Sequence, residues 1–428
     1  MKKNIFLFII HCSRVAILAP LLIANCYPQW LQQTSGVSTS LLDIDFINQN
    51  TGWASGDNGV IVKTTNGGLN WIPQLSGVSK RLEGIDAVDV NTLYCVGWDE
   101  TILKTTDGGN NWIAIRNGPP MQGGSFFKVF FLNANTGWIL RNNYIMRTFN
   151  GCLTFDSSYV IYTYLRDIYF KDAQTGVLCG DGALIMKSTN GGVTWVEITI
   201  PLYNFEEPDF YRLSIVNNNF GWTVGGGDNS GLGKLVYRTT NFGTSWDTIG
   251  RVPYPNNELN YSVFFPSLNT GYCGGTTGYT FKTTNGGFNW IQQVVPSNGF
   301  RRDFNFINDS LGWSVGGGGQ IYITTNGGTY VGVEPISNEI PQDFKLGQNY
   351  PNPFNTETII EFAVTERTYY RLEIFDVLGK KVDEIMNKFL NVGEYKISYN
   401  AGMLSSGTYF YKLSSTELQQ TRKLILIK

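Results

Sequence analysis

Three aspartates that could carry out acid–base chemistry occupy one position of a repeat that runs through this chain. They are Asp43, Asp167 and Asp303. Two carboxyl groups at a suitable separation are what a glycoside hydrolase needs. Other repeats place Lys128 and Arg212 at this position, where they could pair with polar groups of a ligand. The position therefore suggests either glycoside hydrolysis or ligand binding.

The preceding repeat position also mixes charged and aromatic residues. Its members are Leu42, Glu83, Phe127, Arg166, Tyr211, Tyr261 and Arg302. Trp98 lies in a turn expected on the same face, and loops on a rigid scaffold commonly carry binding sites. We predict a surface that recognises a polar ligand, a glycan or a peptide. The predicted binding residues are Asp43, Trp98, Lys128, Arg166, Asp167, Arg212, Tyr211, Tyr261, Arg302 and Asp303. The alternative is a solvated rim with ordinary ion pairs.

Histidine and cysteine chemistry is limited by composition. The one histidine, His11, lies in a segment expected to be removed, which excludes Ser-His-Asp and Cys-His catalysis and histidine-bound zinc. Four cysteines remain, Cys95, Cys152, Cys179 and Cys273. They fall in different repeats, too far apart for disulfides, and no pair has metal-ligand spacing. We therefore predict no catalytic residue, no metal and no cofactor.

The elements that must position these residues follow from a phrase that occurs seven times. Each copy turns at Asn or Asp, in most copies beside a glycine pair, which is a strong hairpin signal. The copies span Thr64–Trp71, Thr105–Trp112, Thr148–Phe155, Ser188–Trp195, Thr239–Trp246, Thr283–Trp290 and Thr324–Val331. A period of roughly 40 to 50 residues indicates one supersecondary unit per repeat. Four short strands can be read in each unit, so we predict an all-β fold with a seven-bladed β-propeller.

The ring is expected to close through the beginning of the chain. Residues 30–38 match residues 71–79 almost residue for residue, so the chain starts with an isolated fourth strand. The seventh phrase lacks its tryptophan, at Val331. We predict that the Trp30 strand completes the seventh blade and protects its edge. The strand order then places the repeat position of the three aspartates, and the position before it, where the inner strands begin, near the central channel.

The repeated phrase resembles the Asp-box, and the repeats are similar to bacterial-neuraminidase repeats. They resemble most the photosystem II assembly-factor group of propellers, over about 300 residues, which implies the fold more than a function. Sialidases, which also contain Asp-boxes, carry a Phe/Tyr-Arg-x-Pro entry, but Ser38–Leu42 lacks the arginine. Xyloglucanase-like relatives place their acids between two propellers, and this chain has one.

A second domain follows after residue 335. Short alternating strands between turn clusters predict a small Ig-like β-sandwich over residues 343–428, joined by a linker at 336–342. The motifs Asn349–Asn355, Phe375–Lys380 and Ser406–Tyr411 resemble, in that order, the type A C-terminal sorting domain of the type IX secretion system. This resemblance implies a partner, the type IX secretion machinery, and export through the periplasm to the medium or the outer cell surface.

The remaining expectations concern the N-terminus and charge. Residues 1–26 have the basic start, apolar run and small residues of a signal peptide, and no other segment is long and apolar enough to span a bilayer. Lys and Arg total 32 against 34 Asp and Glu, which does not indicate a nucleic-acid partner. We predict a non-catalytic, secreted or surface-displayed binding propeller, with a glycan or protein ligand. The alternative is an extracellular glycoside hydrolase that uses the channel carboxylates.

Overall fold

The computed structural model describes residues 30–118, 124–161, 164–202, 207–225, 233–254, 259–293, 295–296, 299–328, 334–337, 341–401 and 404–428. The expected signal peptide at 1–26 lies outside these residues. The regular secondary structure of the described part is β-strand, apart from two short 3-10 turns at Asp57–Gly59 and Gly317–Gly319. No helix in it is long and apolar enough to cross a membrane.

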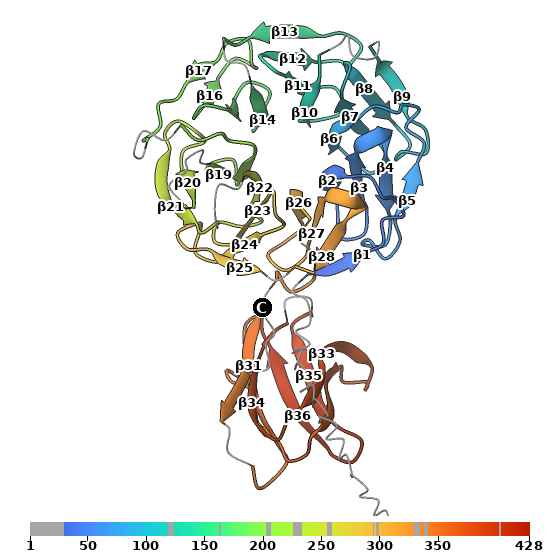
Figure 1. Cartoon of the computed structure of the whole chain (residues 1–428), viewed down its shortest axis with the longest axis vertical. Helices are drawn as coiled ribbons and strands as arrows, with labels where there is room; N and C mark the ends of the chain where they lie inside the picture. Colours follow the sequence, from blue (N-terminus) through green and yellow to red (C-terminus); the bar gives the residue numbers. More distant parts are fainter. Residues whose placement is uncertain are drawn as a thin grey trace, which may run out of the picture.

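Seven four-stranded antiparallel sheets form a ring, and their inner strands surround its centre, which we call the channel (Figure 1). Each blade runs from an inner strand at the channel to an outer strand at the rim. Blades 1 to 3 are β2 (Leu41–Phe46), β3 (Gly52–Gly56), β4 (Ile61–Thr64) and β5 (Ile72–Gln74); β6 (Leu82–Ala87), β7 (Leu93–Gly97), β8 (Thr101–Thr105) and β9 (Ile113–Arg116); β10 (Phe126–Phe131), β11 (Gly137–Arg141), β12 (Tyr144–Thr148) and β13 (Asp156–Tyr159).

Blades 4 to 7 repeat this order. They are β14 (Leu165–Phe170), β15 (Gly176–Gly180), β16 (Ile185–Ser188) and β17 (Val196–Glu197); β18 (Leu213–Val216), β19 (Phe220–Gly225), β20 (Lys234–Thr239) and β21 (Asp247–Val252); β22 (Asn260–Phe264), β23 (Gly271–Gly275), β24 (Thr280–Thr283) and β25 (Ile291–Gln293); β26 (Arg301–Phe306), β27 (Gly312–Gly316), β28 (Ile321–Thr324) and β1 (Leu31–Gln33). The predicted seven-bladed propeller is confirmed.

The first strand of the chain closes the ring. β1 pairs antiparallel with β28, with Leu31 opposite Ile323. Trp30, fully buried, packs against Tyr272, Phe304 and Phe306. The last blade is thus built from both ends of the propeller sequence, as predicted, and its outer edge is covered.

Hydrogen bonds within the Asp-box explain why its sequence folds as a turn. The Thr64 hydroxyl accepts hydrogen bonds from the backbone N–H of Asn66 and Gly68, and Asn66 Oδ1 accepts one from the N–H of Asn70. Gly67 and Gly68 have φ values of +70° and +88°, a region that favours glycine. The side chains thus satisfy the turn amides that no strand can reach.

A second tryptophan position joins neighbouring blades. Trp53, at the start of β3, donates its indole N–H to the Gly108 carbonyl in the Asp-box of blade 2, at 3.2 Å. Trp138, Trp222 and Trp313 make the same bond to the next blade. The Asp-box tryptophan Trp71 packs edge-on against Phe46 in the cluster between blades 1 and 7. Both tryptophan positions therefore belong to the core.

The C-terminal domain is a sandwich of two four-stranded sheets. One sheet has the order β29 (Glu334–Ser337), β34 (Gly393–Asn400), β31 (Glu357–Val364), β30 (Lys345–Leu346). The other has the order β33 (Lys381–Leu390), β32 (Thr368–Phe375), β35 (Gly407–Ser414), β36 (Gln419–Leu426). Since β29 pairs with β34, the boundary expected at residue 335 falls within a strand of the sandwich.

The four cysteines are free and buried, which confirms the prediction that they form no disulfide. Burial raises the pKa of the Cys152 thiol to about 12, and the other three thiols also have raised pKa values. These side chains act as small apolar groups in the core.

Candidate functional site

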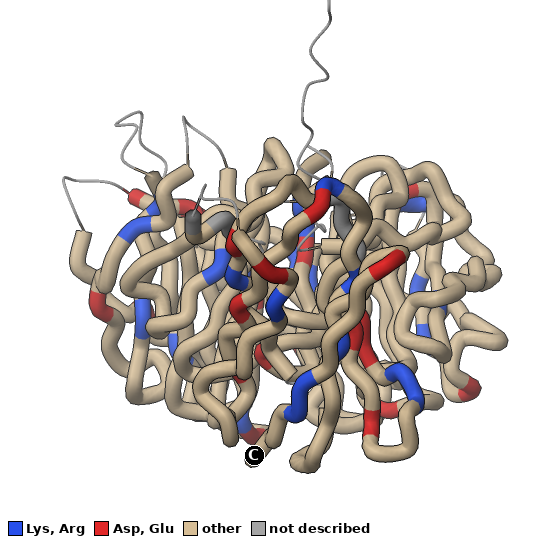
Figure 2. Tube along the Cα trace, turned by 90° about the horizontal axis from the view of Figure 1, so that it is seen from below, with Lys and Arg blue, Asp and Glu red and all other residues tan. Residues whose placement is uncertain are grey.

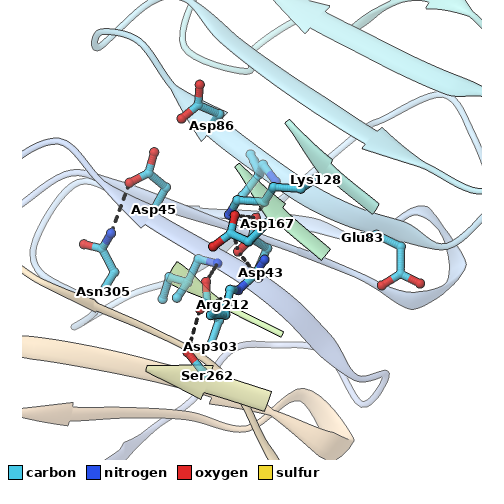
Figure 3. A network of polar contacts seen from close by, with 12 residues as sticks. Asp43, Asp45, Glu83, Asp86, Lys128, Asp167, Arg212, Ser262, Asp303 and Asn305 are labelled. Atoms are coloured by element: carbon cyan, nitrogen blue, oxygen red, sulfur yellow. Dashed lines mark hydrogen bonds and ion pairs between the residues drawn. The ribbon is translucent and has the colours of Figure 1, made fainter. Parts of the chain in front are cut away.

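The repeat position that contains the three aspartates forms a network of polar side chains inside the channel. We call this set of side chains the channel network. Its members are Asp43, Lys128, Asp167, Arg212, Ser262 and Asp303, one from each blade except blade 2, which has Gly84. Asp43 lies between two cations, with Lys128 Nζ at 3.2 Å and Arg212 Nη2 at 2.8 Å. Figure 3 shows these side chains converging on one another.

Asp303 completes the channel network on the opposite side of Arg212. Its Oδ1 lies 3.3 Å from Arg212 Nε and accepts a hydrogen bond from the Ser262 hydroxyl at 2.9 Å. Asp303 and Asp43 therefore share one guanidinium group, which contacts Asp303 through Nε and Asp43 through Nη2.

The channel carboxylates also join the blades through backbone amides. Asp43 accepts a hydrogen bond from Ile85 N–H, Asp167 from Leu213 N–H, and Asp303 from Ile44 N–H. In each pair the amide belongs to the inner strand of the next blade. Inner strands have no further strand beside them, so their free amides need side-chain acceptors. A second tier repeats this pattern, with Asp45, Asp86 and Ser214 as acceptors.

Burial and charge set the pKa values in the channel. Burial raises the pKa of Asp303 to about 8 and that of Asp45 to about 6. Burial acts in the same direction on Asp43, but Lys128 and Arg212 hold the pKa of that carboxyl well below its usual range. Two residues of one type at one repeat position therefore differ in protonation.

The residues at the repeat position just before the three aspartates surround the channel mouth. We call them the mouth ring. A hollow of about 30 Å³ is lined by Glu83, Phe127, Arg166, Tyr211, Arg212, Tyr261 and Arg302. Six of these seven residues are members of the predicted repeat position, and the seventh belongs to the channel network. Its lining has three guanidinium groups and one carboxylate, and Arg212 forms part of both the hollow and the network.

The arginines of the mouth ring are stacked on its tyrosines. The Arg166 guanidinium lies 4.7 Å from the centre of the Tyr211 ring, and Arg302 lies 4.7 Å from that of Tyr261. The two tyrosines meet edge to face at 5.4 Å. Asp181 binds Arg166 through two bonds of 2.7 Å. Stacking and pairing fix the planes of these guanidinium groups before any ligand arrives.

Trp98 extends the ring outward over blade 2. It is 46% exposed, and Arg81 lies over its indole ring. Its N–H donates to Glu83 at 3.0 Å, and Glu83 also pairs with Arg81 and Arg302. Trp98 thus connects to the mouth ring through one carboxylate.

The predicted binding residues separate into two depths. Arg166, Tyr211, Tyr261 and Arg302 line the hollow. Deeper in the channel, Asp43, Lys128, Asp167 and Asp303 bond to groups of this chain, and Arg212 lies between the two levels. Sequence reasoning missed Asp45, Asp86, Arg81 and Asp181. A third repeat position, two residues after the first, could have revealed the second tier of acids. Asp181 gave no such signal because it reaches Arg166 from a turn.

Charge of both signs is interleaved over the molecule (Figure 2). No group of three or more metal-ligating acids, histidines or cysteines occurs among the residues that the structure describes.

Sequence comparison places the propeller in a family. The profile described as photosynthesis system II assembly factor YCF48 matches residues 23–125 and 156–302, more than half of the chain. The chain belongs to the YCF48 family. A curated YCF48-family relative, the photosystem II assembly lipoprotein Ycf48 of Synechococcus sp. (strain CC9902), is 27% identical over 172 residues. That match covers 39% of this chain and 47% of the relative, so the chain spans about half of the relative's length.

Solved structures share the YCF48-type propeller fold. A structure described as YCF48 bound to D1 peptide has a TM-score of 0.57 at 19% identity, covering 71% of this chain and 99% of that one. YCF48 from Cyanidioschyzon merolae has a TM-score of 0.56 at 17% identity, covering 69% and 98%. The GH74 enzyme of Niastella koreensis has a TM-score of 0.54 at 16% identity, covering 94% and 75%. These identities show the fold alone.

The second domain is also assigned by its sequence. The secretion system C-terminal sorting domain profile matches residues 348–428. This YCF48-family chain is therefore exported by the type IX secretion system to the cell surface or the extracellular space.

Proposed function

We propose that this protein is a non-catalytic extracellular binding propeller whose mouth ring holds a polypeptide segment that carries carboxylate groups. The observation that supports this most is the lining of the hollow, which has three guanidinium groups, those of Arg166, Arg212 and Arg302, and one acid, Glu83. Stacked guanidinium groups are suited to carboxylates, which they bind through paired N–H donors. A YCF48 structure solved with a peptide supports the same class of ligand.

The hollow is large enough for a small polar group. Its volume of about 30 Å³ exceeds the roughly 10–15 Å³ that one water molecule needs. We expect the ligand to lie across the tyrosines and insert a carboxylate between the arginines.

The glycoside hydrolase alternative is less well supported. A glycosidase acid and its partner must both reach the scissile bond. Asp43 and Asp303 instead contact Arg212, Lys128 and the backbone of neighbouring blades. The GH74 neighbour shares the fold, at 16% identity.

Defined peptides test the proposal. Calorimetry on the full chain would compare acetyl-(Asp)4-amide with acetyl-(Asn)4-amide. We expect the acidic peptide to bind at least about tenfold more tightly, since charge-assisted bonds are roughly twice as strong as neutral ones. Equal affinities would contradict the proposed ligand class. Release of reducing ends from polysaccharides would show instead that the protein is an enzyme.

A matched pair of arginine variants locates the site. Arg166→Gln should weaken binding of the acidic peptide by about tenfold or more, because it removes one stacked guanidinium. Arg116, which pairs with Glu100 outside the mouth ring, supplies the control. Arg116→Gln should leave the affinity unchanged, and an equal loss in both variants would place the ligand elsewhere.

A further inference from the structure

The channel network has more carboxylates than cations. Asp43, Asp167 and Asp303 act electrostatically on Lys128 and Arg212, and these are the two cations of the network. Three negative charges and two positive ones leave an excess of one. In a buried site such an excess is costly, and a carboxyl group removes it by keeping its proton.

The contacts of Asp303 identify it as the carboxyl that holds this proton. Asp43 contacts both cations, whereas Asp303 contacts only Arg212 of the two. Asp43 and Asp303 share the Arg212 guanidinium and repel each other when both are ionised, so the less stabilised carboxylate is the one to carry the proton. The raised pKa of Asp303, about 8, agrees with this assignment.

The groups that face Asp303 come from several blades. Blade 1 contributes Asp43 and, one tier further along the channel, Asp45. Blade 5 contributes Arg212 and blade 6 the neutral hydroxyl of Ser262. Lys128 of blade 3 interacts electrostatically with Asp303 from across the channel. Asp167 of blade 4 interacts in the same way with Lys128 and Arg212. On its own strand, Arg302 points to the mouth ring and pairs with Glu83.

Arg212 transmits the charge of Asp303 to the mouth ring. Its guanidinium lines the hollow and contacts both Asp43 and Asp303 (Figure 3). With Asp303 neutral, Arg212 is balanced by one adjacent carboxylate. With Asp303 ionised, two carboxylates lie against Arg212 directly beneath the hollow.

We propose that anion binding at the mouth ring is linked to a proton on Asp303. The protonated network accepts a carboxylate of the ligand, and the deprotonated network repels it. This inference rests on the proposed function, and it adds that the site is regulated by pH.

The test measures the dissociation constant of acetyl-(Asp)4-amide for the full chain from pH 6 to pH 9, where the peptide keeps its charge. We expect binding to weaken roughly fivefold or more over this range, a typical coupling between linked sites. Asp303→Asn, which cannot ionise, should show no such change. A pH-independent affinity in the wild type, or an unaltered pH dependence in D303N, would overturn the linkage.

A second variant keeps the proposal testable if D303N does not fold. Ser262 donates a hydrogen bond to Asp303, which favours the charged carboxylate. Ser262→Ala should therefore move the midpoint of the pH dependence to higher pH, and an unmoved midpoint would count against Asp303 as the site. Failure of the peptide to bind at any pH would overturn the proposed function. Binding without pH dependence would overturn the linkage alone.

Discussion

Asp303 and Asp43 show how far the surroundings of a residue change its chemistry. Both are buried aspartates at one repeat position. Asp43 contacts two cations and is ionised, whereas Asp303 shares one of them and binds a proton more tightly. Residue type and spacing alone could not separate these two states.

Stability should depend on pH through Asp303. Its pKa is raised to about 8 in the folded protein, against about 3.9 in an unfolded chain. Folding therefore binds a proton, and this stabilisation is present at low pH and lost as pH rises through 8. Denaturant unfolding at pH 5 and pH 9 measures it. The quantity to compare is the free energy of unfolding of the wild type minus that of D303N. From pH 5 to pH 9 this difference should fall by at least about 1 kcal/mol, the equivalent of roughly one pKa unit.

The comparison with D303N isolates this residue. Asp45 and Asp86 also have pKa values raised by burial, but they are present in both proteins. The lowered pKa of Asp43 affects stability only below its unfolded value near 3.9. A difference that stays constant between pH 5 and pH 9 would mean that Asp303 is ionised throughout.

The Asp-box threonine allows a prediction about a single hydroxyl group. Thr64→Val keeps the shape of the side chain and leaves the buried Gly68 N–H without an acceptor. We expect a loss of about 1–3 kcal/mol in the free energy of unfolding, the cost of an unsatisfied buried donor. The neighbouring exposed residue gives the control, and Thr65→Val should change stability by less than about 0.5 kcal/mol.

Strands meet their hydrogen-bonding needs differently at the two edges of a blade. At the inner edge, free amides bond to carboxylates of the preceding blade, as Ile85 does to Asp43. At the outer edge of blade 7, β1 supplies the missing strand. The inner strands therefore carry acids for a structural reason, which weakens the inference from channel acids to catalysis.

Closure by β1 can be tested at its tryptophan. Trp30 is fully buried against three aromatic rings, and Trp30→Ala should lower the free energy of unfolding by about 3–5 kcal/mol. Leu31, the next residue, is 49% exposed. Leu31→Ala should cost less than about 0.5 kcal/mol. A loss for Trp30→Ala as small as that for Leu31→Ala in denaturant unfolding would mean that β1 contributes through its backbone alone.

The whole molecule combines a β-propeller with an export signal. The sorting domain occupies residues 348–428, and the propeller has its own core clusters. Loss of the sorting domain should therefore stop export and leave the ring intact.

Deletion of residues 348–428 tests this division in a host that has type IX secretion. We expect the truncated chain to accumulate in the periplasm, because the machinery no longer recognises it, while the full chain reaches the surface or medium. Immunoblots of cell fractions measure the distribution. Export of the truncated chain at the normal level would show that the propeller carries a second signal.

The blades, the ring closure and the columns of candidate residues could be predicted from the sequence, because these depend on local turn chemistry and on a period that can be counted. Asp-box phrases specify hairpins through bonds between near neighbours, such as Thr64 and Gly68. The members of each column meet only when seven blades close around the channel. Tertiary structure alone therefore decided that Asp43, Arg212 and Asp303 bond to one another, while Arg166 and Arg302 face the mouth. Partners that are 91 and 169 residues apart leave no local pattern.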